Sequence, residues 1–422
     1  MKIKAFIIMW AVALSGANAQ TLAECQQAAE RNYPLIKRMD LITQTAALTV
    51  ANIQKGWLPQ LTVTAQATLQ SDVTAFPEQM QTVYQQMGID IKGLRKDQYR
   101  IGVDVQQTVF DGGAISSRKE VARREAGVEI ARQEVDIYKV RQRVNELYFS
   151  LLLLDQQIAL SRDLEQLLSS NEQKLSTMFK SGTAAESDYL SLKAERLKAA
   201  QQLASLLSQR QSAAAILSVF CGIEVKSPVK PSPTYDAAPA VRPELRLADS
   251  QVALANAREK ALGAALLPRI GLFAQGFYGY PGYNMFEDMM RRRWSLNGMI
   301  GARLTWNIGA LYTRKNDKAQ LRLARESAEN SREVFLFNNK LEEMRYNEHT
   351  ARYRQLMADD EEIIALRSRV RKAAESKLAH GIIAVNDLLR EINAENTARV
   401  QQSIHEIEML KAIYNAKFTT NN

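Results

Sequence analysis

Residues 61–69 read LTVTAQATL, a strict alternation of apolar and polar side chains. Successive side chains of a β-strand point to opposite faces, so this pattern predicts a strand with one apolar and one polar face. Similar alternation recurs at residues 99–109, 270–280 and 294–306. Each segment has about the ten residues that a tilted strand needs to cross a bilayer. Aromatic residues flank these segments, as at membrane interfaces: Trp57, Tyr99, Tyr280, Trp294 and Trp306.

The alternation alone fits two structures, a membrane-spanning sheet and a soluble, half-buried antiparallel sheet. The N-terminus favours the first. It has basic residues at Lys2 and Lys4, an apolar stretch at residues 5–14 and then Ala17-Asn18-Ala19, which predicts a signal peptide over residues 1–19. A retained membrane anchor is the alternative, but the apolar stretch is short for a bilayer span.

Long helices are predicted between the strands. The chain of 422 residues has only 19 Gly and 10 Pro, and residues 114–178 contain no Pro and one Gly. Apolar residues there recur at spacings near three, four and seven, which is typical of a coiled coil. We predict one helical hairpin over residues 114–221 with its tip near Gly182, and a second over residues 311–418 with its tip near Gly381.

The two halves of the chain resemble each other. Leu58-Pro59 recurs as Leu267-Pro268, and the segment from Gly182 to Asp188 recurs 199 residues later. We therefore predict an internal duplication joined by a Pro-rich linker. The predicted boundaries are residues 20–227 for the first repeat with strands at 58–70 and 99–110, 228–243 for the linker, and 244–422 for the second repeat with strands at 268–280 and 294–306.

Composition and motifs argue against several function classes. The net charge of +9 is spread without a basic block, so nucleic acid is not an expected partner. No Gly-rich phosphate loop is present, and His349, His380 and His405 lack the spacing of metal ligands. No Ser-His-Asp or Cys-His arrangement can be argued. We expect no cofactor, no metal site and no enzymatic activity.

Three motifs in order carry a family resemblance. They are residues 21–34, opening TLAEC, then Leu58-Pro59-Gln60-Leu61, then Val109-Phe110-Asp111-Gly112-Gly113. Together with the two tips they resemble the TolC family of outer-membrane efflux channels. The resemblance implies a membrane α+β fold in which a homotrimer forms one 12-stranded transmembrane β-barrel with four strands per protomer. A long α-helical coiled-coil barrel would continue it through the periplasm of a Gram-negative bacterium.

Physical arguments also favour an oligomer. Four strands cannot close into a barrel, and an open sheet edge in lipid leaves backbone groups unsatisfied at several kcal/mol each. Two copies would give eight strands, a barrel filled by its own side chains, whereas three leave a channel. The polar strand faces would then line the lumen, and the apolar faces would contact outer-membrane lipid.

The resemblance implies a passive exit duct of a tripartite efflux system. Its partners would be a periplasmic membrane-fusion adaptor and an inner-membrane transporter of RND or ABC type. An outer-membrane component of type I protein secretion is one alternative. A periplasmic coiled-coil scaffold or adaptor is another, although such a protein should not carry four duplicated strands.

The hairpin tips are the candidate sites. Gly182 and Gly381 permit tight turns between antiparallel helices, and with Thr183 and Ile382 they are predicted to dock the adaptor, as the resemblance implies.

Two carboxylates follow the tip glycines. Asp188 and Asp387 lie in the first turns of the returning helices, where a carboxylate also stabilises the helix end. The resemblance implies a channel constriction here, in which Asp387 matches a carboxylate of the family's acidic ring. Our candidate gating residues are Asp387, Arg390 and Asp188. This sequence departs from the family at Arg390, where a carboxylate is expected, and at Ile383, where an arginine is expected. Our hypothesis keeps Asp387 at the constriction, with Arg390 of a neighbouring copy as a candidate partner.

Overall fold

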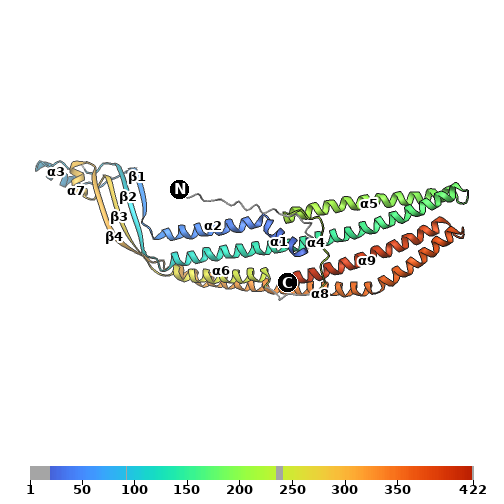
Figure 1. The fold of residues 1–422 in the computed structure, drawn as a ribbon. Helices are drawn as coiled ribbons and strands as arrows, with labels where there is room; N and C mark the ends of the chain where they lie inside the picture. Colours follow the sequence, from blue (N-terminus) through green and yellow to red (C-terminus); the bar gives the residue numbers. More distant parts are fainter. Residues whose placement is uncertain (1–19, 92, 234–240, 421–422) are drawn as a thin grey trace, which may run out of the picture. The chain divides into compact units, whose positions relative to one another are not determined.

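The computed structural model describes residues 20–91, 93–233 and 241–420. The predicted signal peptide and residues 234–240 of the predicted linker lie outside these residues. The elements in chain order are α1 (Leu22–Asn32), α2 (Leu35–Gln54), the 3-10 helix η1 (Lys55–Trp57), β1 (Gln60–Leu69), α3 (Glu78–Gln86), β2 (Asp97–Phe110), α4 (Ala114–Lys180), α5 (Glu186–Cys221), α6 (Pro243–Ala265), β3 (Arg269–Tyr280), α7 (Met285–Arg291), β4 (Ser295–Thr305), α8 (Ala310–Ala379) and α9 (Val385–Thr420) (Figure 1).

The order of elements repeats along the chain. The series α2, β1, α3, β2, α4, α5 is followed by α6, β3, α7, β4, α8, α9. Matching helices have similar lengths, with 67 residues in α4 and 70 in α8, and 36 in both α5 and α9. Helix α1 precedes the first series and begins with a capping box, in which Thr21 and Glu24 bind each other's backbone N–H groups. The structure therefore carries the duplication in its helices as well as its strands.

The chain divides into two compact units. The first contains the described residues of the ranges 1–39, 131–247 and 332–422, and the second contains those of the ranges 40–130 and 248–331. The sheet, α3, α7 and the adjoining helical segments belong to the second unit. Both hairpin tips belong to the first unit.

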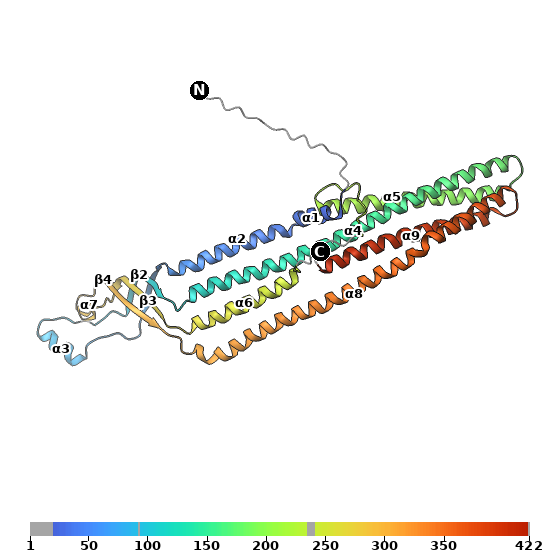
Figure 2. The same cartoon turned by 60° about the horizontal axis from the view of Figure 1, so that its bottom comes forward.

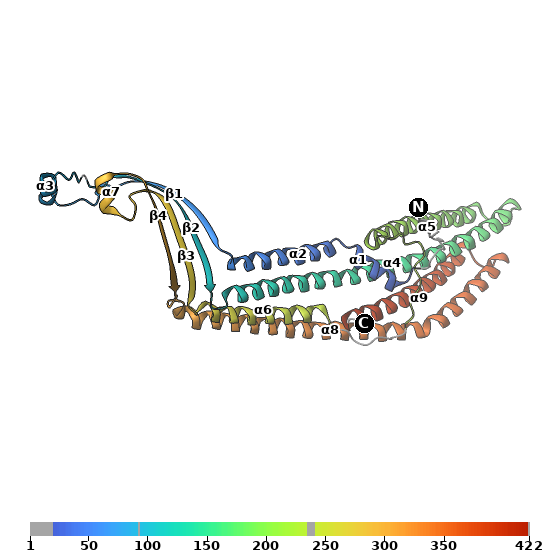
Figure 3. The same cartoon turned by 60° about the vertical axis from the view of Figure 1, so that its left-hand side comes forward.

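The second unit is built on a four-stranded antiparallel sheet with the order β1-β2-β3-β4 (Figure 3). The pairing of β2 with β3 joins the two halves of the chain. Within the described residues, neither β1 nor β4 has a second neighbouring strand. A register shift between Thr108 and Phe110 places Phe110, rather than Val109, opposite Ile270. The sheet thus has two open edges.

The two connections at one end of the sheet are ordered and contain the short helices α3 and α7. Ile91, Leu94, Tyr280 and Met289 form a small buried cluster there. The Tyr280 hydroxyl accepts a hydrogen bond of 3.0 Å from the Arg95 backbone N–H. These contacts fold the two connections against each other.

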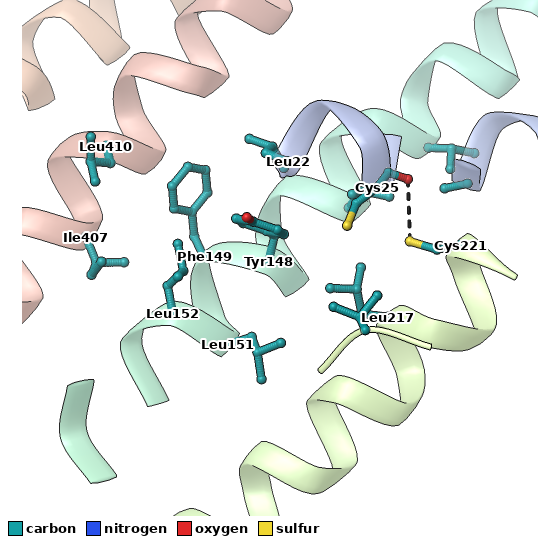
Figure 4. Close-up of a cluster of buried hydrophobic side chains, with 14 residues drawn as sticks. Leu22, Cys25, Tyr148, Phe149, Leu151, Leu152, Leu217, Cys221, Ile407 and Leu410 are labelled. Atoms are coloured by element: carbon teal, nitrogen blue, oxygen red, sulfur yellow. Dashed lines mark hydrogen bonds between the residues drawn. The ribbon is translucent and has the colours of Figure 1, made fainter. Parts of the chain in front are cut away.

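The main core of the first unit lies where α1, α4, α5 and α9 meet. Tyr148 and Phe149 of α4 are at its centre, between Leu22 and Leu410 (Figure 4). The Tyr148 hydroxyl lies 2.7 Å from the carbonyl oxygen of Gln20 and 2.6 Å from that of Val229. Burying these apolar side chains provides most of the stability of such a junction.

Both cysteines lie in this core as free thiols. Cys25 and Cys221 are buried, and the Cys221 thiol donates a hydrogen bond of 3.4 Å to the Cys25 carbonyl oxygen (Figure 4). The hydrogen bond between the two side chains, and then burial, raise the pKa of the Cys25 thiol. The Cys25 thiol therefore stays neutral inside the core.

No helix in the described part of the chain is both long enough and apolar enough to cross a bilayer.

Candidate functional site

The two hairpin tips have the same backbone geometry. Helix α4 ends at Lys180 and is followed by Gly182, whose φ is +75°, and α8 ends at Ala379 and is followed by Gly381, whose φ is +72°. In each tip the N–H of the glycine and that of the following residue bond back to carbonyls of the preceding turn. The bonds are Gly182 to Phe179 (3.0 Å), Thr183 to Met178 (2.8 Å), Gly381 to Leu378 (2.9 Å) and Ile382 to Lys377 (2.9 Å). This is the Schellman arrangement, which requires a left-handed residue that glycine adopts without strain.

The four residues predicted to dock a partner are all exposed at these tips. Ile382 presents an apolar side chain that is 68% exposed. The Thr183 hydroxyl donates a hydrogen bond of 3.0 Å to the Met178 carbonyl, so it reinforces the turn. Gly182 and Gly381 have open space where a Cβ would lie. The turns are therefore accessible, and their shape is set by the backbone.

Asp387 occupies the first turn of α9 and has two partners in its own chain. Its Oδ2 accepts a hydrogen bond of 3.3 Å from the Ala384 backbone N–H, which satisfies one of the free donors at the helix start. Its Oδ1 lies 3.3 Å from Nη2 of Arg390, one turn further along α9. Asp387 is thus paired with Arg390 of its own chain, and its pairing with Arg390 of a neighbouring copy stays a prediction.

Asp188 occupies the equivalent turn of α5 and is half-buried. Within the described residues, no ion pair joins Asp188 to Arg390. The structure therefore brings together Asp387 and Arg390, and it places Asp188 in the other hairpin.

A shared apolar cluster stabilises both tips. Leu192 of α5, together with Val385 and Leu388 of α9, has no exposed surface. Leu175 of α4 packs in the same cluster. Because residues of both hairpins fill one cluster, each tip is held by the packing of the other.

Each hairpin also carries an ion pair that sequence reasoning missed. Helices α4 and α5 form one hairpin, and α8 and α9 form the other (Figure 2). Glu172 of α4 pairs with Arg196 of α5, and Arg371 of α8 pairs with Glu395 of α9. Burial acts to raise the pKa of Glu395, but hydrogen bonds from Arg399 and Arg371 outweigh it and hold that pKa below its ordinary value. Each pair joins two helices of one hairpin. The sequence could have revealed it only if the residues that lie opposite each other in the two helices had been known.

The sheet of the second unit has two chemically different faces. One face is apolar and largely exposed: Leu61 is 68%, Leu296 82% and Ile300 85% exposed. The register places them together with other apolar residues of neighbouring strands, such as Val105 opposite Leu61. The other face carries Thr, Gln, Asn and Arg side chains. Such a large exposed apolar surface requires a partner, either lipid or another protein.

The part of the chain that the structure describes contains no group of three or more His, Cys, Asp or Glu side chains that could hold a metal ion.

The fold combines an open four-stranded sheet that has one apolar face with two long helical hairpins, and its order of elements is repeated along the chain. The predicted α+β fold class is confirmed by three solved structures among those that match. A membrane protein from Pseudomonas aeruginosa matches with a TM-score of 0.69 and 15% identity over 94% of this chain and 90% of that one. The Campylobacter jejuni CmeC outer membrane channel matches with a TM-score of 0.67 and 12% identity over 94% of this chain and 85% of that one. The open state of the Neisseria gonorrhoeae MtrE outer membrane channel matches with a TM-score of 0.66 and 13% identity over 95% of this chain and 89% of that one.

A comparison by sequence covers the N-terminal part of the chain. Residues 17–222 match the family model of the outer membrane efflux protein. The resemblance to TolC-family channels is thereby confirmed, and this segment is an outer membrane efflux protein domain. Comparison with curated proteins yields no match. The matching family model is that of efflux proteins, and two of the three solved neighbours are outer membrane channels.

Proposed function

We propose that three copies of this chain form an exit duct in the outer membrane of a Gram-negative bacterium. The observation that carries the proposal is the open sheet. Its edge strands β1 and β4 lack outer partners within the described residues, and its apolar face is exposed. Pairing β1 of one copy with β4 of the next satisfies both edges, and three copies give twelve strands around a lumen. The apolar face then contacts lipid.

Conduction through such a duct is passive. The long hairpins α4–α5 and α8–α9 form the helical part, which we place in the periplasm. The exposed tip residues Gly182, Thr183, Gly381 and Ile382 dock a periplasmic adaptor, and an inner-membrane transporter of RND or ABC type supplies the energy. Asp387, Arg390 and Asp188 line the constriction at the entrance. Support for this assignment comes from the duplicated tip geometry and from the family of residues 17–222.

Drug or metal efflux and type I protein secretion both use such a duct. We favour efflux because the family model that matches is that of efflux proteins.

A pair of adjacent residues in β4 tests the membrane assignment. Ile300 lies on the apolar face and Met299 on the polar face, and both are exposed in the isolated chain. Ile300→Arg should cost about 2–4 kcal/mol near the middle of a bilayer, because the charge would face lipid. Met299→Arg is the matched control, since its charge would face water. We expect Ile300→Arg alone to abolish recovery of the protein in the outer-membrane fraction. Equal recovery of both variants would contradict the barrel.

A further inference from the structure

Strand β3 places two phenylalanines on the polar face of the sheet, each opposite a glycine. Phe277 lies opposite Gly102 of β2, and Phe273 lies opposite Gly301 of β4. A Cβ added to Gly102 would come to 2.8 Å from the Phe277 Cβ, and one added to Gly301 would come to 2.8 Å from the Phe273 Cζ. The side chains of the phenylalanines therefore occupy the space that the glycines leave. Two aromatic rings on an otherwise Thr- and Gln-rich face call for a reason other than lipid contact.

An arginine two residues from each glycine covers each ring. The Cζ atom of Arg100 lies 3.8 Å from the ring centroid of Phe277, and that of Arg303 lies 5.0 Å from the centroid of Phe273. Both distances are within the roughly 6 Å range of a cation–π interaction. Phe277 is only 4% exposed, whereas both arginines are exposed. The rings thus hold two guanidinium groups close to the sheet while their charges remain accessible.

The charges on this face are unbalanced. The paired strands place three arginines, Arg100, Arg269 and Arg303, and one aspartate, Asp104, on the polar face. Within the described residues none of the four has an ion-pair partner. Three positive charges against one negative charge leave a net charge of +2 on the face of each chain. The apolar face carries no charged residue in the paired central part of the sheet.

We propose that this face makes the lumen of the barrel selective for anions, so that the duct favours anionic solutes. The inference rests on the trimeric barrel proposed above, in which the polar face lines the lumen. Three copies would then surround the lumen with six excess positive charges. Rings of arginine select anions in pores, and the low-dielectric wall of a barrel strengthens their field. Stacking on Phe273 and Phe277 keeps the guanidinium groups from folding away.

Reversal potentials in planar bilayers test this inference with the full chain. The probe is a KCl gradient across single trimeric pores. Arg100→Gln combined with Arg303→Gln should lower the ratio of chloride to potassium permeability by about twofold or more, since the field in the lumen is weakened. Arg100→Lys combined with Arg303→Lys keeps the charge and should keep most of the ratio. Asp104→Asn removes the one acidic group and should raise the ratio.

The outcomes separate this inference from the proposed function. Pores whose reversal potential is unchanged in both the double Gln variant and Asp104→Asn would overturn the anion selectivity and leave the duct intact. A double Lys variant that behaves like the double Gln variant would show that packing, and not charge, sets the ratio. If the double Gln variant does not fold, Asp104→Asn decides alone. A wild-type protein that forms no pores would overturn the duct and this inference with it.

Discussion

Arg371 of α8 pairs with Glu395 of α9 at the position where the first hairpin has the opposite charges. The offset of 199 residues that relates Gly182 to Gly381 also relates Glu172 to Arg371, and Arg196 to Glu395. Both pairs join residues 24 positions apart in the chain. Both hairpins therefore have an ion pair at the same position, but the acidic residue is on the first helix of one hairpin and on the second helix of the other. What the position requires is a pair, and either order of charges satisfies the geometry.

Reversing the second pair should be tolerated far better than breaking it. Arg371→Glu places a third carboxylate beside Glu375 and Glu395, whose side chains are 25% and 7% exposed. Breaking a buried pair costs about 3–5 kcal/mol, and we expect a loss near the lower end because water reaches part of the cluster. Adding Glu395→Arg restores the order of the first hairpin, and part of the loss should return, although the new arginine also lies beside Arg399. Melting temperature followed by helical circular dichroism gives the comparison. A double variant no more stable than Arg371→Glu would contradict the equivalence.

The stability of the second hairpin should fall in acid because of Glu395. Its folded-state pKa is lowered, so its contribution is fully present above the unfolded-state value of 4.5 and is lost as pH falls through the lower folded-state value. The melting temperature of the wild type should therefore exceed that of Glu395→Gln at neutral pH, and this difference should shrink below about pH 4. The measurement is the difference in melting temperature as a function of pH. A difference that stays constant from neutral to strongly acidic pH would rule out this carboxylate as its source.

The tip glycines should respond to alanine in the opposite sense from a glycine inside a helix. Gly381 has a φ of +72° and nothing within 4 Å of an added Cβ, so Gly381→Ala meets backbone strain alone, of about 1–2 kcal/mol. Gly127 within α4 also has open space but ordinary helical backbone, so Gly127→Ala should stabilise by about 0.5–1 kcal/mol. Unfolding of the two purified variants measures both effects. Two changes of the same sign would contradict the assignment of the turn.

Loss of Asp387 should increase conduction if this carboxylate holds the constriction closed. Asp387 and Arg390 form an exposed pair, with side chains 48% and 75% exposed. Exposed pairs contribute at most about 1 kcal/mol each, so the ratio of open to closed channels should change at most about fivefold for each copy in the trimer. Asp387→Ala and Arg390→Ala should both raise single-channel conductance or open probability. Asp163→Ala, in the middle of α4, is the control and should have no effect. Wild-type behaviour in both tip variants would remove Asp387 and Arg390 from the gate.

Features that depend on local periodicity could be predicted from the sequence. The strand at residues 61–69 was predictable because successive side chains of a strand point to opposite faces. The structure has β1 over Gln60–Leu69. The turns at Gly182 and Gly381 follow from the same local reasoning, because a residue with positive φ is needed to end each helix.

Features that depend on partners distant in sequence could not be predicted. The register shift near Val109 turns Phe110 toward Ile270, whereas strict alternation puts Val109 on the apolar face. Phe273 and Phe277 depart from the polar pattern of their face because glycines on neighbouring strands make room for them. The acidic residues 359–362 are typical of a solvated helix face. In the structure, however, Asp360 is buried, and its Oδ2 lies 2.8 Å from Nδ1 of His405.

The central claim is that this chain closes its open sheet by assembling as a trimer with a lumen. Native mass spectrometry of detergent-extracted protein, followed by conductance of the same preparation in planar bilayers, tests it most directly. We predict a mass of three chains and discrete conductance steps, both lost together when the sample is heated. A monomeric protein in the soluble periplasmic fraction that forms no pores would contradict the account and would favour a coiled-coil scaffold.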